Sequence, residues 1–306
     1  GETNLMSIVI LSRGQCGLSK CITHYLVAMS VADLMVIIIS VIFFRIIPSY
    51  FHISFVSITP VCRVLMVLTS STSAISVWLT VAFTFDRYVA ICCQNLKIKY
   101  CSENTSRTVI VILSVVFFVE NLPWGFIVEP LYIVNNIPWG CNPKTRYFTS
   151  RIWAAFDMLN HILTPILPFI KILLLNALTV RHILEASRGR RRLRGNSKGN
   201  RNRDASDSDP EMKNRRKSII LLFAVSTSFI LLWITYVLYF LYWRISKTYS
   251  YTNDPMFITW KTGYMLNCSI NTCIYTATQQ KFREEVKKTL HCTVKISRNT
   301  ETYKLE

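Results

Sequence analysis

Long runs without charged residues constrain this chain more than any other feature of its sequence. A helix rises about 1.5 Å per residue, so roughly 20 apolar residues cross the hydrocarbon core of a bilayer. Such runs recur along the 306 residues, of which 51% are hydrophobic and 17% charged, and the mean hydropathy is +0.31. Soluble domains carry about 25% charged residues. The pattern therefore predicts an all-α membrane protein rather than a soluble globular one.

Six complete membrane spans and one partial span are expected. They cover residues 4–11 (the partial span), 26–44, 64–85, 108–127, 152–170, 218–243 and 255–278. The chain opens without a basic segment or an initiator Met, which speaks against a signal peptide, and we expect its first helix to be truncated. Short connections and the lack of an internal repeat predict a single seven-transmembrane helix bundle.

Basic residues set the expected orientation of the bundle. Lys and Arg number 35 against 17 Asp and Glu, a formal net charge of +18. They gather in the loops after the first, third and fifth spans and in the C-terminal tail, and the fifth-span loop contains the dense run 188–194. Cytosolic loops carry the excess of Lys and Arg, so these loops and the C-terminus are predicted to be cytosolic. This distribution explains the charge without nucleic-acid binding.

The segment 186–212 is the one low-complexity stretch, rich in Arg, Ser, Asn, Gly and Asp. It has too little apolar surface to offset the entropy of ordering, so we expect a disordered third cytosolic loop. It is either a solvated linker attracted to anionic lipid or a regulatory loop phosphorylated at Ser206 and Ser208.

A tripeptide, Asp86-Arg87-Tyr88, closes the third span at its cytosolic end. Here the chain resembles the rhodopsin-like (class A) G-protein-coupled receptors, whose third helix ends in Asp-Arg-Tyr. Family positions in other spans agree with the resemblance: Asn4, Asp33, Cys62, Pro168, Phe229, Trp233, Asn271, Tyr275 and Phe282.

The resemblance implies a G-protein coupling switch and a disulfide. The switch residues would be Asp86, Arg87, Tyr88, Phe229, Trp233, Asn271 and Tyr275. In the family, the cysteine at the outer end of the third helix pairs with one in the second outer loop, which here makes a pair of Cys62 and Cys141. Two free thiols are the alternative.

A sodium site is the other implied feature of the bundle interior. Asp33, Ser76, Asn267 and Asn271 supply oxygens from three spans, and an isolated buried carboxylate is costly unless a cation or hydrogen bonds compensate it. The family binds sodium there. The alternative is a protonated Asp33 in a hydrogen-bonded water network.

Several residues depart from the family pattern. Thr235 and Thr272 replace the prolines of the sixth and seventh helices, and Asn176 replaces a fifth-helix tyrosine. Arg215 stands where many members have an acid that pairs with the third-helix arginine. We therefore predict that Arg87 is restrained only by Asp86 and that basal signalling is appreciable.

The ligand pocket is predicted by aligning helix positions on these landmarks. The third span carries no aspartate that would pair with an amine, and the combination of acids with Lys261 indicates a peptide-like or zwitterionic ligand. Internal pairing of Lys261 with Glu120 or Asp157 remains an equal alternative. The predicted lining is Met66, Thr69, Ser70, Glu120, Asn121, Asp157, Asn160, Trp233, Tyr236, Tyr239, Lys261 and Tyr264, with His161 nearby.

Near the C-terminus, apolar residues alternate with Lys and Glu, which predicts an amphipathic helix at about 279–291. The receptor bundle is then expected to cover residues 1–291, and a cytosolic tail to cover 292–306. Cys292 is either a palmitoylated anchor or a free thiol. Within the family, the fourth and fifth spans resemble an orphan peptide-type group that includes a receptor for aromatic amino acids.

Three classes of function compete. The resemblance implies a plasma-membrane receptor that activates a heterotrimeric G protein, with an extracellular ligand, membrane lipids, arrestin and receptor kinases as partners. A seven-helix transporter or channel is the alternative, but the interior polar residues form no continuous path and no inverted repeat is present. An enzyme would need a nucleophile–base pair or a metal cluster, and neither spacing is found; apart from sodium, we expect no cofactor or metal.

Overall fold

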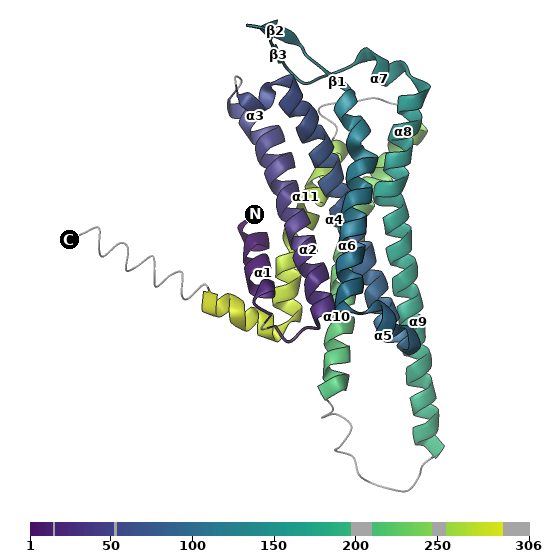
Figure 1. The fold of residues 1–306 in the computed structure, drawn as a ribbon. Coiled ribbons are helices and arrows are strands. Elements are labelled where there is room, and N and C mark those ends of the chain that lie inside the picture. The colour runs from purple at the N-terminus through teal and green to yellow at the C-terminus, as the bar shows by residue number, and fades with distance from the viewer. Residues whose placement is uncertain (15, 52–53, 197–209, 247–254, 290–306) are drawn as a thin grey trace, which may run out of the picture.

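The computed structural model describes residues 1–14, 16–51, 54–196, 210–246 and 255–289 as a bundle of long helices (Figure 1). The helices of the first half are α1 (Glu2–Ser12), α2 (Lys20–Val36), η1 (Ile37–Ile46), α3 (Ile47–Tyr50), η2 (Phe55–Ser57), α4 (Thr59–Cys92), α5 (Gln94–Tyr100), α6 (Glu103–Asn121) and η3 (Leu122–Phe126). The second half contains α7 (Thr145–Thr149), α8 (Arg151–His161), η4 (Ile162–Ile166), α9 (Leu167–Asn196), α10 (Pro210–Ser246) and α11 (Pro255–Thr278).

The long helices confirm the predicted membrane bundle. Among the described residues, five helical stretches have the length and apolar composition to cross a membrane: Lys20–Phe43, Thr59–Cys92, Glu103–Phe126, Arg151–Ala186 and Ser218–Thr235. The short apolar α1 and the 24-residue α11 complete the set of seven. The outward face of α6 is apolar, with Val111, Val115 and Val119 all more than half exposed. A lipid environment covers such a face; water would not favour it.

Capping residues fix where two of these helices begin. The Ser19 Oγ accepts a hydrogen bond from the Ile22 N–H at 3.5 Å, and the Ser102 Oγ accepts one from the Thr105 N–H at 3.2 Å. Each serine satisfies an amide that has no partner within its own helix. In α4, Pro60 lies in the first turn, where its missing N–H costs nothing. The local sequence thus sets the starts of α2, α4 and α6.

The fifth span changes direction inside η4. Thr164, just before Pro165, has φ −141° and ψ 87°, outside the helical region. A residue that precedes proline avoids the helical conformation, and proline itself has no N–H to donate. The indole of Trp78 donates to the Leu163 carbonyl at 3.1 Å, so a carbonyl at the interruption gains a partner from α4. The break therefore lies before Pro165, three residues ahead of the Pro168 that matches the family position.

The sixth span, α10, is one continuous helix from Pro210 to Ser246. Thr235 stands inside it and its hydroxyl donates to the Leu232 carbonyl at 3.0 Å, so the backbone passes this position without a break. This agrees with the absence of the usual proline.

The helices on either side of the predicted disordered loop, 186–212, extend into it. α9 continues as a helix to Asn196 and α10 begins at Pro210, while residues 197–209 lie outside the described part of the chain. Arginine is a good helix former. The Arg181–Glu185 ion pair, one helical turn apart, also stabilises the part of α9 that precedes this segment. Propensity therefore extends the helix beyond residue 186, where we expected order to end.

Small sheets and a disulfide cover one end of the bundle (Figure 1). Strands β2 (Tyr132–Val134) and β3 (Ile137–Trp139) form a hairpin through Asn135 and Asn136, both at positive φ, and β1 (Val128–Glu129) pairs with β4 (Asn142–Pro143). Asparagine tolerates this conformation and favours such two-residue turns. The Cys62–Cys141 disulfide joins the start of α4 to the loop beside this hairpin, which confirms the predicted pairing.

A short helix follows α11 and lies across the opposite end of the bundle (Figure 1). It covers residues 280–289, within the predicted 279–291. Phe282 and Val286, four residues apart, are buried in the main core cluster together with Leu26, Phe83 and Tyr275. The helix is therefore fixed to the bundle by one apolar face.

Candidate signalling switch and interior polar sites

Arg87 lies near the end of α4 and is held from two sides. Its guanidinium forms an ion pair with the Asp86 carboxylate, and both residues are at most 5% exposed. Its Nη1 also donates to the Ser218 hydroxyl of α10 at 3.2 Å. The expectation that only Asp86 restrains Arg87 is therefore wrong. A serine three residues beyond Arg215 supplies a tie between α4 and α10 without a carboxylate.

Two thiols complete the surroundings of Asp86. The Cys21 Sγ donates to Asp86 Oδ1 at 3.2 Å, and the Cys101 Sγ lies 3.6 Å from the Asp86 carbonyl oxygen. Burial, reinforced by the Asp86 charge, raises the pKa of the Cys101 thiol to about 11. The Cys101 thiol is therefore protonated at neutral pH and can donate a hydrogen bond. The sequence analysis missed both thiols because nothing in their spacing relates them to Asp86. The third motif residue, Tyr88, is half-buried on α4.

Asp33 lies at the centre of a second buried polar cluster. Its Oδ1 accepts from the Ser76 hydroxyl at 2.5 Å, and its Oδ2 accepts from the Asn271 Nδ2 at 2.6 Å. Asn267 lies one helical turn before Asn271 on α11 and is also buried. The structure thus brings together all three helices that supply the predicted cation site. Among the described residues, no basic side chain forms an ion pair with Asp33, and the hydrogen bonds to its carboxyl group come from neutral donors.

The predicted aromatic switch residues are packed in the core. Phe229 and Trp233 of α10 stack with centroids 5.7 Å apart and belong to a cluster with Val77, Val81 and Ile172 of α4 and α9. Tyr275 of α11 is fully buried and meets Phe282 edge-on at 5.9 Å. A movement of α10 would therefore disturb its packing against two neighbouring helices.

Thr272, which stands in place of the seventh-helix proline, joins α11 to α1. Its hydroxyl contacts the Ser7 hydroxyl at 2.7 Å and the Thr3 carbonyl at 2.9 Å. Asn4 adds a hydrogen bond from its Nδ2 to the Cys268 carbonyl at 2.8 Å. These buried bonds attach the short α1 to the bundle.

The predicted ligand residues fall on five helices, and the structure describes most of them. Met66, Thr69 and Ser70 lie on α4, Glu120 and Asn121 end α6, and Asp157, Asn160 and His161 lie on α8. Asn121 donates to Glu120 Oε2 at 2.6 Å, while Glu120 Oε1 and Thr69 Oγ1 are buried without a hydrogen-bond partner among the described residues. Trp233 lies on α10. Tyr236, Tyr239, Lys261 and Tyr264 occupy helical positions, but their side chains lie outside the described residues, as does all of Cys292.

Asp157 has partners near its own helix. Tyr147 donates to Asp157 Oδ1 at 3.3 Å, and His161 Nδ1 lies 3.6 Å from the same oxygen. Pairing of Lys261 with this acid or with Glu120 was one of the two alternatives. The observed pairs come instead from α7 and α8 and leave both alternatives for Lys261 open.

An aromatic cluster that the sequence analysis missed surrounds this region. Trp124 packs against Tyr147 and Phe156 with centroids 6.3 and 5.3 Å apart, and Trp153 joins both rings. The Trp124 indole donates to Asn160 Oδ1 at 3.4 Å. Met66 packs on the same cluster beside the disulfide. The high aromatic content was visible in the sequence, but the residues are spread over η3, α7 and α8, and only the fold brings them together.

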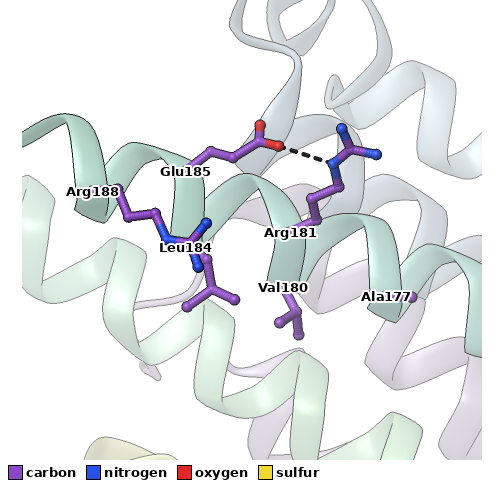
Figure 2. Close-up of a pocket in the computed structure, with 6 residues that line it drawn as sticks. All are labelled: Ala177, Val180, Arg181, Leu184, Glu185 and Arg188. Atoms are coloured by element: carbon purple, nitrogen blue, oxygen red, sulfur yellow. Dashed lines mark hydrogen bonds and ion pairs between the residues drawn. The ribbon is translucent and has the colours of Figure 1, made fainter.

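A cavity of about 480 Å³ lies along α9 toward its C-terminal part. Figure 2 shows that its six lining residues project from one stripe of this helix: Ala177, Val180, Arg181, Leu184, Glu185 and Arg188. None of the predicted ligand residues lines it. It lies toward the end of the bundle where α9 and α10 project beyond the other helices (Figure 1).

Seven helices, a disulfide at one end and a buried Asp-Arg pair at the other define a seven-transmembrane receptor. A sequence model described as "7 transmembrane receptor (rhodopsin family)" matches residues 3–275, and the chain belongs to this family of multi-pass membrane receptors. The chain is also 27% identical over 282 residues to the Tachykinin-like peptides receptor 86C of Drosophila melanogaster, an alignment that covers 89% of the chain. The chain spans about half the length of this relative, 53%. Family membership excludes the enzyme and favours a receptor over a transporter or channel.

Proposed function

We propose that this chain is a ligand-activated receptor that drives nucleotide exchange on a heterotrimeric G protein. The observation that carries the proposal is the position of Arg87, a buried cation held by Asp86 on its own helix and by Ser218 on α10. The contact with Ser218 is a single hydrogen bond between two helices, so it breaks when α10 moves away from α4. A freed guanidinium offers up to five donors to the carbonyl groups of a protein partner.

The outer end of the bundle supplies the signal that moves α10. A ligand between α4, α6, α8 and α10 favours one arrangement of these helices only if it binds that arrangement more tightly. Phe229 and Trp233 lie between this region and Arg87, packed against α4 and α9. A change in their packing therefore transmits a ligand's preference to the Arg87–Ser218 contact.

The ligand we propose is peptide-like or zwitterionic. Two buried oxygens, Glu120 Oε1 and Thr69 Oγ1, lack a partner among the described residues, and a buried polar atom is costly when unpaired. An ammonium or amide group of a ligand would satisfy them. The relative in Drosophila is named as a receptor for tachykinin-like peptides, which favours a peptide here as well. Aromatic amino acids are the small zwitterions to compare with it.

We further propose that sodium binds beside Asp33. The carboxylate, the Ser76 hydroxyl and the amide oxygens of Asn267 and Asn271 are hard oxygen ligands that suit a small cation. The cation would compensate a buried charge that has only neutral donors around it. Because it would bind between α2, α4 and α11, it would stabilise the arrangement in which those helices are close.

The orientation follows from the basic loops, with the C-terminus and the α9–α10 connection in the cytosol. The cavity of Figure 2 then lies on the cytosolic side, where Arg181 and Arg188 would meet an acidic partner or anionic lipid. Arrestin and receptor kinases would act at the same face. A lipid on Cys292 would anchor the helix 280–289 to the membrane.

The test is activation of a panel of G proteins in cells that express the chain at the surface. Tachykinin-like peptides and aromatic amino acids are applied to wild type and to Arg87→Ala. We expect a response in wild type, basal or ligand-induced, that Arg87→Ala loses. Wild type at the surface that never exceeds mock-transfected cells, or a response that Arg87→Ala retains in full, would overturn the proposal.

A further inference from the structure

A single lysine lies on the membrane face of the fifth span. Lys171 is exposed on α9, inside the stretch Arg151–Ala186 that is long and apolar enough to cross a membrane. Its neighbours Ile170 and Leu174 are each more than half exposed, so hydrocarbon surrounds the lysine on this face. A charged group at such depth is costly in free energy, and charges retained there are usually functional.

The depth of Lys171 follows from the helices that flank it. It lies ten residues before Arg181 on α9, about 15 Å of helix. Its Nζ lies 4.6 Å from the centroid of the Trp78 ring, and Trp78 is nine residues before Arg87 on α4, about 14 Å of helix. The distances along α9 and α4 give the same depth, so the ammonium lies well inside the hydrocarbon layer. It is directed toward the ring and does not reach the cytosolic interface.

Trp78 is a fixed platform for this ammonium. Its ring stacks on Phe117 of α6 with centroids 5.2 Å apart, and its indole N–H donates to the Leu163 carbonyl at the interruption of the fifth span. Three elements therefore fix the ring: α4, α6 and η4. An aromatic face attracts a cation but carries no charge to neutralise it.

The ammonium has no anionic partner in the part of the chain that the structure describes. No carboxylate lies within 4.0 Å of Lys171 there. The acids of the described spans each have a hydrogen-bond or ion-pair partner inside the bundle, and none of them pairs with Lys171: Asp33, Asp86, Glu103, Glu120, Asp157 and Glu185.

We propose that Lys171 and Trp78 form a lipid-facing site for the carboxylate of a long-chain amphiphile, a free fatty acid. Such a molecule reaches the site through the bilayer, its chain lies along Ile170 and the exposed leucines of α9, and its one charge pairs with the ammonium. An anionic phospholipid is less suited, because its phosphate and ester groups would all have to leave the interface by about 14 Å of helix rise, whereas a fatty acid brings a single carboxylate. The site lies where α4, α6 and α9 meet, on the outside of the bundle, and is separate from the outer ligand region and from Asp33.

The test uses a photoreactive long-chain fatty acid with an alkyne tag, with the full chain in phosphatidylcholine nanodiscs. Crosslinks are mapped by mass spectrometry for wild type, Lys171→Met and Lys171→Arg. Arg107→Met is the control, because it removes an exposed cation near the start of α6. A hydrogen bond to a charged group is worth about 1.5–3 kcal/mol, so labelling around residue 171 should fall about tenfold or more in Lys171→Met. It should persist in Lys171→Arg and in Arg107→Met.

Competition identifies the group that is bound. Oleate should displace the probe from wild type, and oleyl alcohol, which has the same chain without the charge, should not. Equal labelling of wild type and Lys171→Met would overturn the proposal. Displacement by phosphatidic acid but not by oleate would overturn it in favour of a phospholipid headgroup. The variants need no G-protein response for this readout, so failure of receptor coupling would not affect the result.

Discussion

At the scale of single residues, the guanidinium of Arg87 has one charged and one neutral partner. The pair with Asp86 is within α4 and does not depend on where α10 lies. The bond to Ser218 is the one that links the switch arginine to α10. In the proposed mechanism, this hydrogen bond sets how readily the resting arrangement opens.

Ser218→Ala should raise basal G-protein signalling. The substitution removes one hydrogen bond to a charged group, worth about 1.5–3 kcal/mol, and leaves the ion pair with Asp86 intact. We expect a several-fold increase in second messenger per receptor at the cell surface. Ser228→Ala is the matched control, because the Ser228 hydroxyl donates to the Val225 carbonyl of the same helix. Equal basal levels in wild type and Ser218→Ala would show that the tie does not restrain the switch.

Sodium should stabilise the purified chain through Asp33. A cation at ten times its dissociation constant adds about 1.4 kcal/mol to a folded state that alone binds it. The thermal midpoint in sodium chloride should exceed that in potassium chloride of equal ionic strength by a few °C. Asp33→Asn should abolish this difference, and Asp157→Asn should retain it, because Asp157 pairs with Tyr147 and His161 elsewhere. No dependence on sodium in wild type would favour the protonated Asp33.

The Cys101 thiol should react slowly with alkylating reagents while the chain is folded. Its pKa is raised from 9.0 to about 11, and the thiolate is the reactive form. Since folding favours the protonated thiol, its contribution to stability is complete below pH 9.0 and declines as the pH rises toward 11. Mass spectrometry of alkylation at pH 7, 8 and 9 should show about tenfold faster reaction per pH unit in the folded chain. A rate equal to that of the denatured chain would contradict the buried position.

At the scale of helices, Thr272 stands where the family has a proline, and the hydrogen bonds of its hydroxyl join α11 to α1. Thr272→Val keeps the shape of the side chain but leaves the Ser7 hydroxyl and the Thr3 carbonyl without this partner. We expect a loss of about 1–3 kcal/mol and a lower thermal midpoint, with reduced surface expression. Thr278→Val is the control, since its hydroxyl bonds only the Ile274 carbonyl of its own helix. A midpoint equal to wild type would mean that the Thr272 hydroxyl does not help to hold α1.

The helices themselves follow from the sequence, and their interruptions follow less well. Apolar runs of span length indicate where the helices lie, although α2 and α6 begin earlier than these runs, directly after their capping residues Ser19 and Ser102. Pro165 permits the interruption at Thr164, and Trp78 from another helix supplies the hydrogen bond to the Leu163 carbonyl beside it. The extension of α9 to Asn196 overrides the composition of that segment. Local patterns therefore predict the elements, while contacts between elements decide how they bend.

At the scale of the whole molecule, the bundle separates polar sites by depth. The buried positions of Asp33 and Arg87 were predictable because family positions mark these residues in the sequence. The bonds that complete the switch, from Ser218 and from the thiols of Cys21 and Cys101, join residues far apart in the chain and carry no local signal. The aromatic cluster around Trp124 is hidden from the sequence for the same reason.

The central claim is that Arg87, released from α10, couples the bundle to a G protein. The most direct measurement is the rate of nucleotide exchange on purified heterotrimeric G proteins by the chain in nanodiscs. Ser218→Ala removes the hydrogen bond between Arg87 and α10, so the assay needs no ligand. We predict that Ser218→Ala accelerates exchange several-fold over wild type, that Ser218→Ala with Arg87→Ala falls to the rate without receptor, and that Ser218→Ala with Arg107→Ala remains fast. Exchange that stays equally fast after Arg87→Ala would contradict the account.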